Sequence, residues 1–153
     1  MYCQGGITMK TVILYYSKHH ENTRKLLDAI QKEYHVTLID ITQNPNIDLS
    51  SYDRIGFASG IYYSKFQKTL LEYANKYMPN NKETFFIYTY GAEKVGYTNA
   101  IKEAVNKHNA KVLGEFGCFG FNTFGPFKLI GGIAKGHPDS NDIDNVLKFY
   151  KEL

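Results

Sequence analysis

The chain has 153 residues, of which 43% are hydrophobic and 22% are charged, and its formal net charge is +3. This length suits one domain with one hydrophobic core, and the composition excludes an intrinsically disordered protein. The basic residues are spread over several predicted helices instead of forming one stripe, which argues against a nucleic-acid-binding protein.

The first ten residues, Met1–Lys10, show no periodic pattern. A second methionine, Met9, stands just before the first predicted strand. We therefore expect residues 1–10 to be a disordered tail or the product of an upstream start codon. Residues 11–153 are then expected to form a single domain.

Predicted strands and helices alternate through the rest of the chain. Short apolar runs rich in β-branched and aromatic residues predict five buried strands. These strands are Thr11–Tyr16, Val36–Asp40, Arg54–Ser59, Thr84–Tyr90 and Lys111–Cys118. Apolar residues at helical spacing predict four helices, at Thr23–Tyr34, Phe66–Tyr77, Ile101–His108 and Ile143–Tyr150. This alternation indicates an α/β protein with a parallel sheet covered by helices on both faces.

Two connections depart from the alternation. The link Ile41–Asp53 is too short and polar for a full helix, so we expect one helical turn there at most. The segment Phe119–Asp139 is long and rich in glycine and aromatic residues, and loops of that length in compact domains are often functional. Ser140 or Asn141 is the expected N-cap of the last helix.

The chain contains two cysteines, Cys3 and Cys118. They lie far apart and form no CxxC pair, which predicts neither a metal site nor a redox dithiol. No apolar run is long enough to span a membrane, and no segment has the pattern of a signal peptide. The expected location is therefore the reducing cytoplasm.

The first candidate ligand segment joins the first strand to the first helix. In an open parallel sheet, ligands bind beyond the carboxyl ends of the strands, where the strand order reverses. A helix N-terminus there presents free N–H groups and a partial positive charge, which favour phosphate. The candidate residues are Ser17, Lys18, His19, His20, Glu21, Asn22 and Thr23. An ordinary helix cap with exposed polar neighbours would use the same residue types.

Two further candidate segments follow the third and fourth strands. Each combines a glycine, which allows a ligand to approach closely, with aromatic side chains that suit the walls of a flat ring. The candidate residues are Ser59, Gly60, Ile61, Tyr62, Tyr63, Thr89, Tyr90 and Gly91. Each segment alone also fits an ordinary turn, but their recurrence at successive strand ends favours a ligand site.

Three stretches carry a resemblance to a known family. ILYYSKHHENTRKLLDAI runs from a strand through a polar loop into a helix, SGIYYSKFQ follows the third strand, and FGCFGFNTFGPFKLIGGIAKGHP precedes the last helix. The first resembles the flavodoxin strand, its Ser/Thr-rich loop ending in Gly-Asn-Thr, and the following helix. The second resembles the second flavin loop, especially in flavodoxin-like protoporphyrinogen oxidases. The third is similar to the end of short flavodoxin-family proteins, so the resemblance covers residues 11–153.

The resemblance implies a flavodoxin-like three-layer sandwich whose five-stranded parallel sheet has the order 2-1-3-4-5, with one non-covalent FMN. Ser17–Thr23 would hold the phosphate, while Ser59–Tyr63 and Thr89–Gly91 would flank the isoalloxazine ring. Gly60 and Ile61 are the nearest candidates for the backbone carbonyl that meets flavin N5 in this family. The implied function is electron transfer to or from a redox protein or a small electron acceptor, with no catalytic side chain.

Three features depart from the family pattern. Glu21 stands where glycine usually precedes Asn-Thr, and a carboxylate beside a phosphate is repulsive unless it pairs with Lys18, Arg24 or a histidine. Electron-carrier flavodoxins are strongly acidic, whereas this chain is basic, so docking on the usual basic partners is not expected. The chain contains no tryptophan, so tyrosine must serve any stacking on the ring.

Three alternative functions stay open. An FMN-dependent oxidoreductase acting on a quinone or porphyrinogen would use Phe119–Asp139 to cover its substrate. A nicotinamide-binding domain would place Asp40 on the ribose, although the first loop lacks GxGxxG. An interaction module would have lost tight FMN binding through Glu21. The sequence leaves the choice between carrier and enzyme open, and also the oligomeric state.

Overall fold

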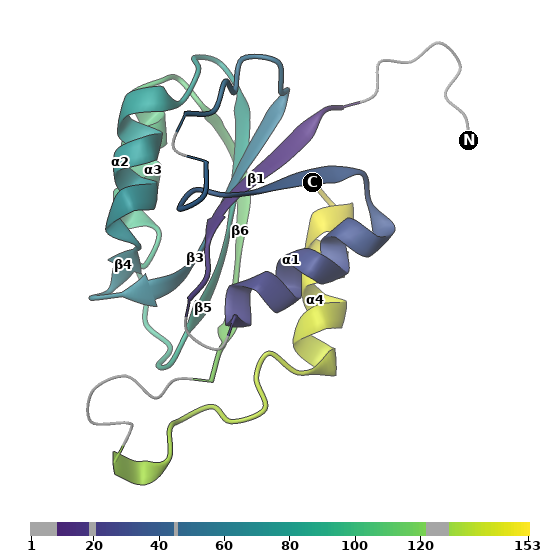
Figure 1. Cartoon of the computed structure of the whole chain (residues 1–153), viewed down its shortest axis with the longest axis vertical. Helices are drawn as coiled ribbons and strands as arrows, with labels where there is room; N and C mark the ends of the chain where they lie inside the picture. Colours follow the sequence, from purple (N-terminus) through teal and green to yellow (C-terminus); the bar gives the residue numbers. More distant parts are fainter. Residues whose placement is uncertain (1–8, 19–20, 45, 122–128) are drawn as a thin grey trace.

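The computed structural model describes residues 9–18, 21–44, 46–121 and 129–153. Its elements are β1 (Thr11–Tyr16), α1 (Asn22–Glu33), β2 (Val36–Asp40), β3 (Arg54–Tyr62), β4 (Lys65–Phe66), α2 (Lys68–Tyr77), β5 (Glu83–Tyr90), α3 (Asn99–Asn106), β6 (Lys111–Phe119) and α4 (Ser140–Lys151). Helices α1 and α4 cover one face of the sheet, and α2 and α3 cover the other (Figure 1). The predicted three-layer α/β sandwich is therefore confirmed.

The sheet order confirms the predicted topology. Five parallel strands run in the order β2-β1-β3-β5-β6, and the short β4 pairs antiparallel with β3. Without β4 this is the expected order 2-1-3-4-5. The chain goes from β1 to β2 on one side and returns to β3 on the other, so the strand order reverses at β1. Such a reversal opens a crevice at the carboxyl ends of the strands.

Two apolar cores hold the layers together, one on each face of the sheet. Along β1, Val12 and Leu14 belong to the core under α2 and α3, whereas Ile13 and Tyr15 belong to the core under α1 and α4. Successive side chains of a strand point to opposite faces, so a central strand with both faces covered needs a continuous apolar run. This explains why TVILYY contains almost no polar residue.

The end of β3 differs from the prediction. We expected the strand to stop at Ser59 and the next helix to include Phe66, but β3 continues to Tyr62 and forms a hairpin with β4. Helix α2 begins at Lys68, because the Gln67 side chain accepts hydrogen bonds from two backbone N–H groups of its first turn. Phe66 is buried in the same core as the helix residues, which explains why its spacing suggested a helix.

The structure corrects the expected N-cap of α4 and agrees with the expected link between β2 and β3. The N-cap of α4 is Asp139, not Ser140 or Asn141, because Asp139 and Asp142 exchange hydrogen bonds with each other's backbone N–H groups in a capping box. The link between β2 and β3 forms no helix among its described residues, in agreement with its short polar sequence.

The start of the domain is joined to the sheet through Lys10. Its backbone N–H donates to the Asp53 carboxylate at 2.8 Å, and its carbonyl accepts from the Asp53 N–H, also at 2.8 Å. Residues 1–8 of the expected tail, and Cys3 with them, lie outside the described residues. In the part of the chain that is described, no helix is long and apolar enough to cross a membrane.

The two-residue tip of the β3–β4 hairpin carries backbone strain. Tyr63 and Ser64 have φ of 50° and 66°, which is the left-handed region that favours glycine. We expect Ser64→Gly to raise the free energy of unfolding by about 0.5–1 kcal/mol, because relief of the left-handed strain outweighs the entropy that glycine adds to the unfolded chain. Urea titration followed by circular dichroism measures the change.

The same substitution in an unstrained turn is the control. Ser51 is exposed and does not have a positive φ. Ser51→Gly is therefore expected to lower the free energy of unfolding by a few tenths of a kcal/mol. Equal effects of the two substitutions would contradict the assignment of strain to the hairpin tip.

Candidate functional site

A cavity of about 190 Å³ opens at the carboxyl edge of the sheet, where the strand order reverses. It is lined by Ser17, Lys18, Asn22, Thr23, Gly60, Ile61, Tyr62, Tyr63, Thr89, Tyr90, Gly91, Gly120 and Phe121. All three predicted segments therefore meet at one site, although they are far apart in the sequence. The cavity is smaller than the roughly 300–1,000 Å³ of most small-molecule sites, so a nucleotide-sized ligand would lie partly outside it.

Two predicted candidates among the described residues, Ser59 and Glu21, do not line the cavity. Ser59 is fully buried, and its hydroxyl accepts from the Gln67 N–H at 3.1 Å, joining β3 to the start of α2. Glu21 is exposed and lies outside the lining. His19 and His20 lie outside the described residues, so their assignment to a ligand stays a prediction.

Two further residues line the cavity that the sequence does not predict as ligand residues, Gly120 and Phe121. They directly follow β6, in the segment for which the sequence predicts a long loop. The rule that ligands gather after each parallel strand applies to β6 as well, and it was the available signal.

The N-terminus of α1 faces the cavity without a side-chain cap. Its N-cap residue, Glu21, has φ 52° and ψ 35° and makes no capping hydrogen bond. The Ser17 hydroxyl oxygen instead accepts from the backbone N–H of Arg24 at 3.2 Å, which leaves the hydroxyl hydrogen available to a ligand. The first turn thus offers N–H groups and a partial positive charge to an anion.

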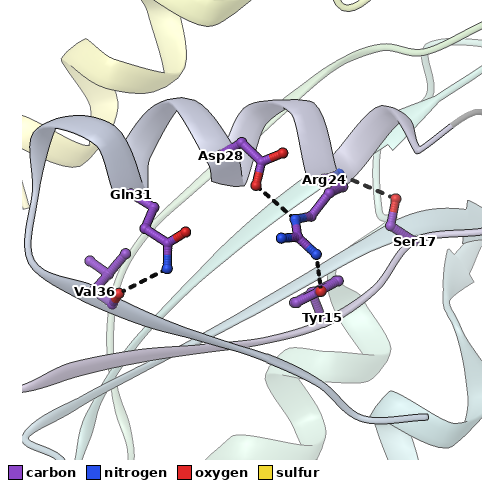
Figure 2. A network of polar contacts seen from close by, with 6 residues as sticks. All are labelled: Tyr15, Ser17, Arg24, Asp28, Gln31 and Val36. Carbon is purple, nitrogen blue, oxygen red and sulfur yellow. Dashed lines mark hydrogen bonds and ion pairs between the residues drawn. The ribbon is translucent and has the colours of Figure 1, made fainter. Parts of the chain in front are cut away.

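Arg24 forms its ion pair with Asp28 and not with Glu21. Its Nε donates to the Asp28 carboxylate at 2.7 Å, and its Nη1 donates to the Tyr15 hydroxyl. Figure 2 shows the guanidinium held between these two side chains, while Ser17 approaches only the Arg24 backbone. The hydrogen bond to Asp28 raises the pKa of Arg24. Among the described residues that line the cavity, Lys18 is the cation.

Two side chains at the start of α1 connect this helix to the end of β5 and to the segment after β6. The Thr23 hydroxyl shares a hydrogen bond with the Thr89 hydroxyl at 3.1 Å, and the Asn22 Nδ2 donates to the Phe121 carbonyl at 2.8 Å. Asn22 is 7% exposed, and its buried Oδ1 has no hydrogen-bond partner among the described residues. A buried acceptor without a donor costs free energy, which makes Oδ1 a candidate acceptor for a ligand hydroxyl.

Gly120 allows this connection. A Cβ atom at this position would lie 2.7 Å from Asn22 Nδ2, which is closer than side chains tolerate. The glycine after β6 therefore lets the Asn22 side chain pack directly against the backbone and reach the Phe121 carbonyl.

Aromatic side chains form the walls of the cavity. Tyr62 and Tyr63 come from the β3–β4 hairpin, and Tyr90 comes from the end of β5, where its ring packs on Phe119 with 4.9 Å between centroids. Burial raises the pKa of Tyr62 to about 12, so its hydroxyl keeps its proton at physiological pH. Phe119 itself belongs to β6 and not to a loop.

Gly60 lines the cavity from within a regular strand. It lies inside β3 and has no left-handed φ, and a Cβ there would make only ordinary contacts, the nearest at 3.5 Å to Tyr62. Its carbonyl accepts from the Ser59 hydroxyl at 2.5 Å. Ile61 is paired with β4, so both candidates for the N5-facing carbonyl belong to regular strand. That assignment stays a prediction.

The segment after β6 is anchored near its end by His137. The His137 carbonyl accepts from the Phe121 N–H at 2.9 Å, and Nδ1 of its ring lies 2.7 Å from the Asp142 carboxylate. The hydrogen bond with Asp142 raises the pKa of the imidazole. His137 therefore connects the rim of the cavity to the N-terminus of α4.

A second hollow, of about 510 Å³, lies at the amino edge between the start of β1 and the end of α1. Its lining includes Gln31 and Tyr34 at the C-terminal end of α1, where the helix dipole is negative. The helix dipole at this position does not favour a phosphate. Asp40, the residue considered for a ribose, bonds to Thr42 and does not line the carboxyl-edge cavity.

The strand order and a ligand cavity at its reversal point define a protein of the flavodoxin-like α/β class. Residues 12–124 match the family model described as the flavodoxin domain. An uncharacterized protein of Methanocaldococcus jannaschii is 36% identical over 148 residues, which cover 95% of this chain and 98% of that protein. The chain therefore belongs to the flavodoxin domain family.

Solved structures agree with this fold. A flavodoxin from the domain Archaea superimposes with a TM-score of 0.63 at 18% identity, covering 92% of each chain. A flavoprotein from Lactobacillus acidophilus in complex with FMN has a TM-score of 0.55 at 23% identity and covers 72% of this chain and 93% of its own. At these identities the similarity establishes the fold.

We expect Gly120→Ala to lower the free energy of unfolding by about 1–3 kcal/mol, because the added methyl displaces Asn22 and breaks its bond to Phe121. Gly60→Ala is the matched control and should change stability by less than about 0.5 kcal/mol, because its Cβ meets no close neighbour. Urea unfolding of both variants tests this, and equal losses would contradict the packing role of Gly120.

The raised pKa of His137 predicts a pH-dependent contribution to stability. The folded state binds this proton more tightly than the unfolded state, so the stabilisation is complete below the ordinary histidine pKa of about 6.5. It is lost as the pH rises through the raised folded pKa. The difference in unfolding free energy between the native chain and His137→Asn should therefore shrink from pH 5.5 to pH 8, and a constant difference would contradict the ion pair with Asp142.

Proposed function

We propose that this protein binds one FMN in the carboxyl-edge cavity and acts as an electron carrier. The proposal rests on two features that lie together where the strand order of the sheet reverses. One is the N-terminus of α1, which lacks a side-chain cap, and the other is a set of tyrosine walls. Phosphate suits the first and an isoalloxazine ring suits the second.

The phosphate end fits the residues present. The first turn of α1 offers backbone N–H groups, Ser17 keeps a hydroxyl hydrogen, and Lys18 adds a positive charge. In the Thr23–Thr89 pair only one hydroxyl needs to donate to the other, so one hydrogen stays available. Glu21 opposes the charge of a phosphate, but its side chain does not line the cavity.

The remaining part of the nucleotide also finds a matching group. The buried Asn22 Oδ1 is an acceptor without a donor, and a phosphate ester cannot donate to it, whereas a ribityl hydroxyl can. The relative from Lactobacillus acidophilus, solved in complex with FMN, supports the same cofactor for this chain.

Bound FMN would supply reversible one- and two-electron chemistry. The protein's part is to hold the ring and to set its surroundings. Tyr62 and Tyr90 line the cavity and would exclude water from the ring, and the resulting low dielectric would disfavour extra negative charge there. No side chain is needed as an acid or base for electron transfer.

The deciding experiment is the visible spectrum of the purified protein after mixing with FMN and desalting. Retained absorbance with quenched fluorescence supports the proposal. Flavin that washes through would favour the interaction module. Steady turnover of a quinone by the loaded protein would favour the oxidoreductase over the carrier.

Glu21→Gly is expected to tighten FMN binding roughly five- to tenfold. The substitution removes a negative charge near the phosphate and relieves the strain of the left-handed backbone conformation at this position. Glu21→Gln removes the charge but keeps the strained backbone, so it separates the two contributions. Fluorescence titration with FMN gives the dissociation constants.

The control for this series is Glu33→Gln at the exposed far end of α1. It removes the same charge at the opposite end of the helix, farther from the cavity than one Debye length. Solvent ions screen that charge, so FMN affinity should stay unchanged. Equal or weaker FMN binding by Glu21→Gly would contradict the proposed position of the phosphate.

A further inference from the structure

The first turn of α1 lacks the local contacts that usually fix the start of a helix. Its N-cap residue, Glu21, makes no side-chain capping hydrogen bond, and the turn contains no acidic side chain. Asn22 and Thr23 tie this turn to the ends of β6 and β5. Arg24 supplies a connection to β1, the strand that precedes the helix.

The Arg24 guanidinium is held at two points, which Figure 2 shows together. Its Nη1 donates to the Tyr15 hydroxyl of β1, and its Nε donates to the Asp28 carboxylate at 2.7 Å, one helical turn further along α1. The guanidinium carbon also lies 5.2 Å from the centre of the Tyr15 ring. Tyr15 is 6% exposed and packs in the core under α1 and α4, so the strand end of this contact is rigid. We call Tyr15, Arg24 and Asp28 the Arg24 clamp.

The main chain of Arg24 connects the clamp to the cavity. Arg24 is not among the residues that line the cavity, whereas Ser17 is. The Arg24 backbone N–H donates to the Ser17 hydroxyl oxygen at 3.2 Å. A shift of the clamp would therefore move the N–H groups of the first turn and the Ser17 hydroxyl together.

The charge of Arg24 has little reach toward the cavity. The guanidinium is paired with the Asp28 carboxylate, and the two side chains are 37% and 48% exposed. Solvent screens an exposed ion pair, and the opposite charges largely cancel at a distance. What the clamp supplies is geometry, because a hydrogen bond weakens steeply when its donor and acceptor are misaligned.

We propose that Arg24 is a positioning residue for the phosphate of FMN. Its side chain holds the first turn of α1 on β1, so that the N–H groups of this turn and the Ser17 hydroxyl meet the phosphate in the right arrangement. The inference rests on the proposed function, which places the phosphate at the N-terminus of α1. The tyrosine walls belong to β5 and to the β3–β4 hairpin, so the clamp does not hold the flavin ring.

The test compares FMN with riboflavin, which has the same ring and no phosphate. Fluorescence titration gives the dissociation constant of each flavin, and their ratio measures the contribution of the phosphate. Tyr15→Phe removes the hydroxyl that holds Arg24 on β1 and leaves the charge of Arg24 in place. Arg24→Gln removes the whole clamp. Each variant should raise the Kd of FMN roughly three- to tenfold and leave the Kd of riboflavin within about twofold.

Two further variants separate geometry from charge. Arg24→Lys keeps the charge but not the planar fork that reaches both partners, so it should weaken FMN binding as Arg24→Gln does. Lys25→Gln is the matched control, because Lys25 is the next residue of α1 and is exposed. It removes the same charge outside the clamp and should leave both dissociation constants within about twofold. Far-UV circular dichroism checks that each variant is folded.

The outcomes separate the two proposals. A native chain that binds neither flavin would refute the proposed function, and the inference with it. If the native chain binds FMN, equal weakening of FMN and riboflavin by Arg24→Gln would give Arg24 a general structural role and overturn only the inference. Equal effects of Arg24→Gln and Lys25→Gln, or an unchanged FMN affinity in Tyr15→Phe, would also overturn it.

Discussion

β1 lies between β2 and β3, and this placement controls the geometry of the whole carboxyl edge. Since α1 connects β1 to β2 across one face while α2 connects β3 to β5 across the other, the two connections leave the edge in opposite directions. A hollow stays open between them, and the N-terminus of α1 points its free N–H groups toward it. The cavity and the connections around its mouth owe their position to this reversal.

Polar contacts between distant segments then hold the hollow in one shape. Thr23 is bonded to Thr89, and Asn22 is bonded to Phe121, so the start of α1 is fixed to the ends of β5 and β6. These side chains serve the architecture first, and what they offer a ligand is the remainder, such as the unpartnered oxygen of Asn22. A site held in this way binds with little loss of conformational entropy.

The charge distribution sets this protein apart from the acidic carriers that its family resemblance suggests. Glu21 is placed at the helix N-terminus, yet its side chain lies outside the cavity lining, so the helix dipole and Lys18 still favour an anion inside. Around the mouth, exposed lysines and carboxylates lie in the same connections as exposed apolar residues such as Val95.

The sequence by itself determined the alternation of strands and helices, the sheet order through the family resemblance, and three of the four segments at the cavity. Apolar periodicity and turn residues act over a few positions, so they can be read locally. Only the tertiary structure decided that Gly60 lies inside a strand, that Asp139 caps α4, and that Phe121 completes the site. Asn22 and Phe121 are 99 positions apart, and contacts at that separation depend on how the whole sheet assembles, which no local pattern contains.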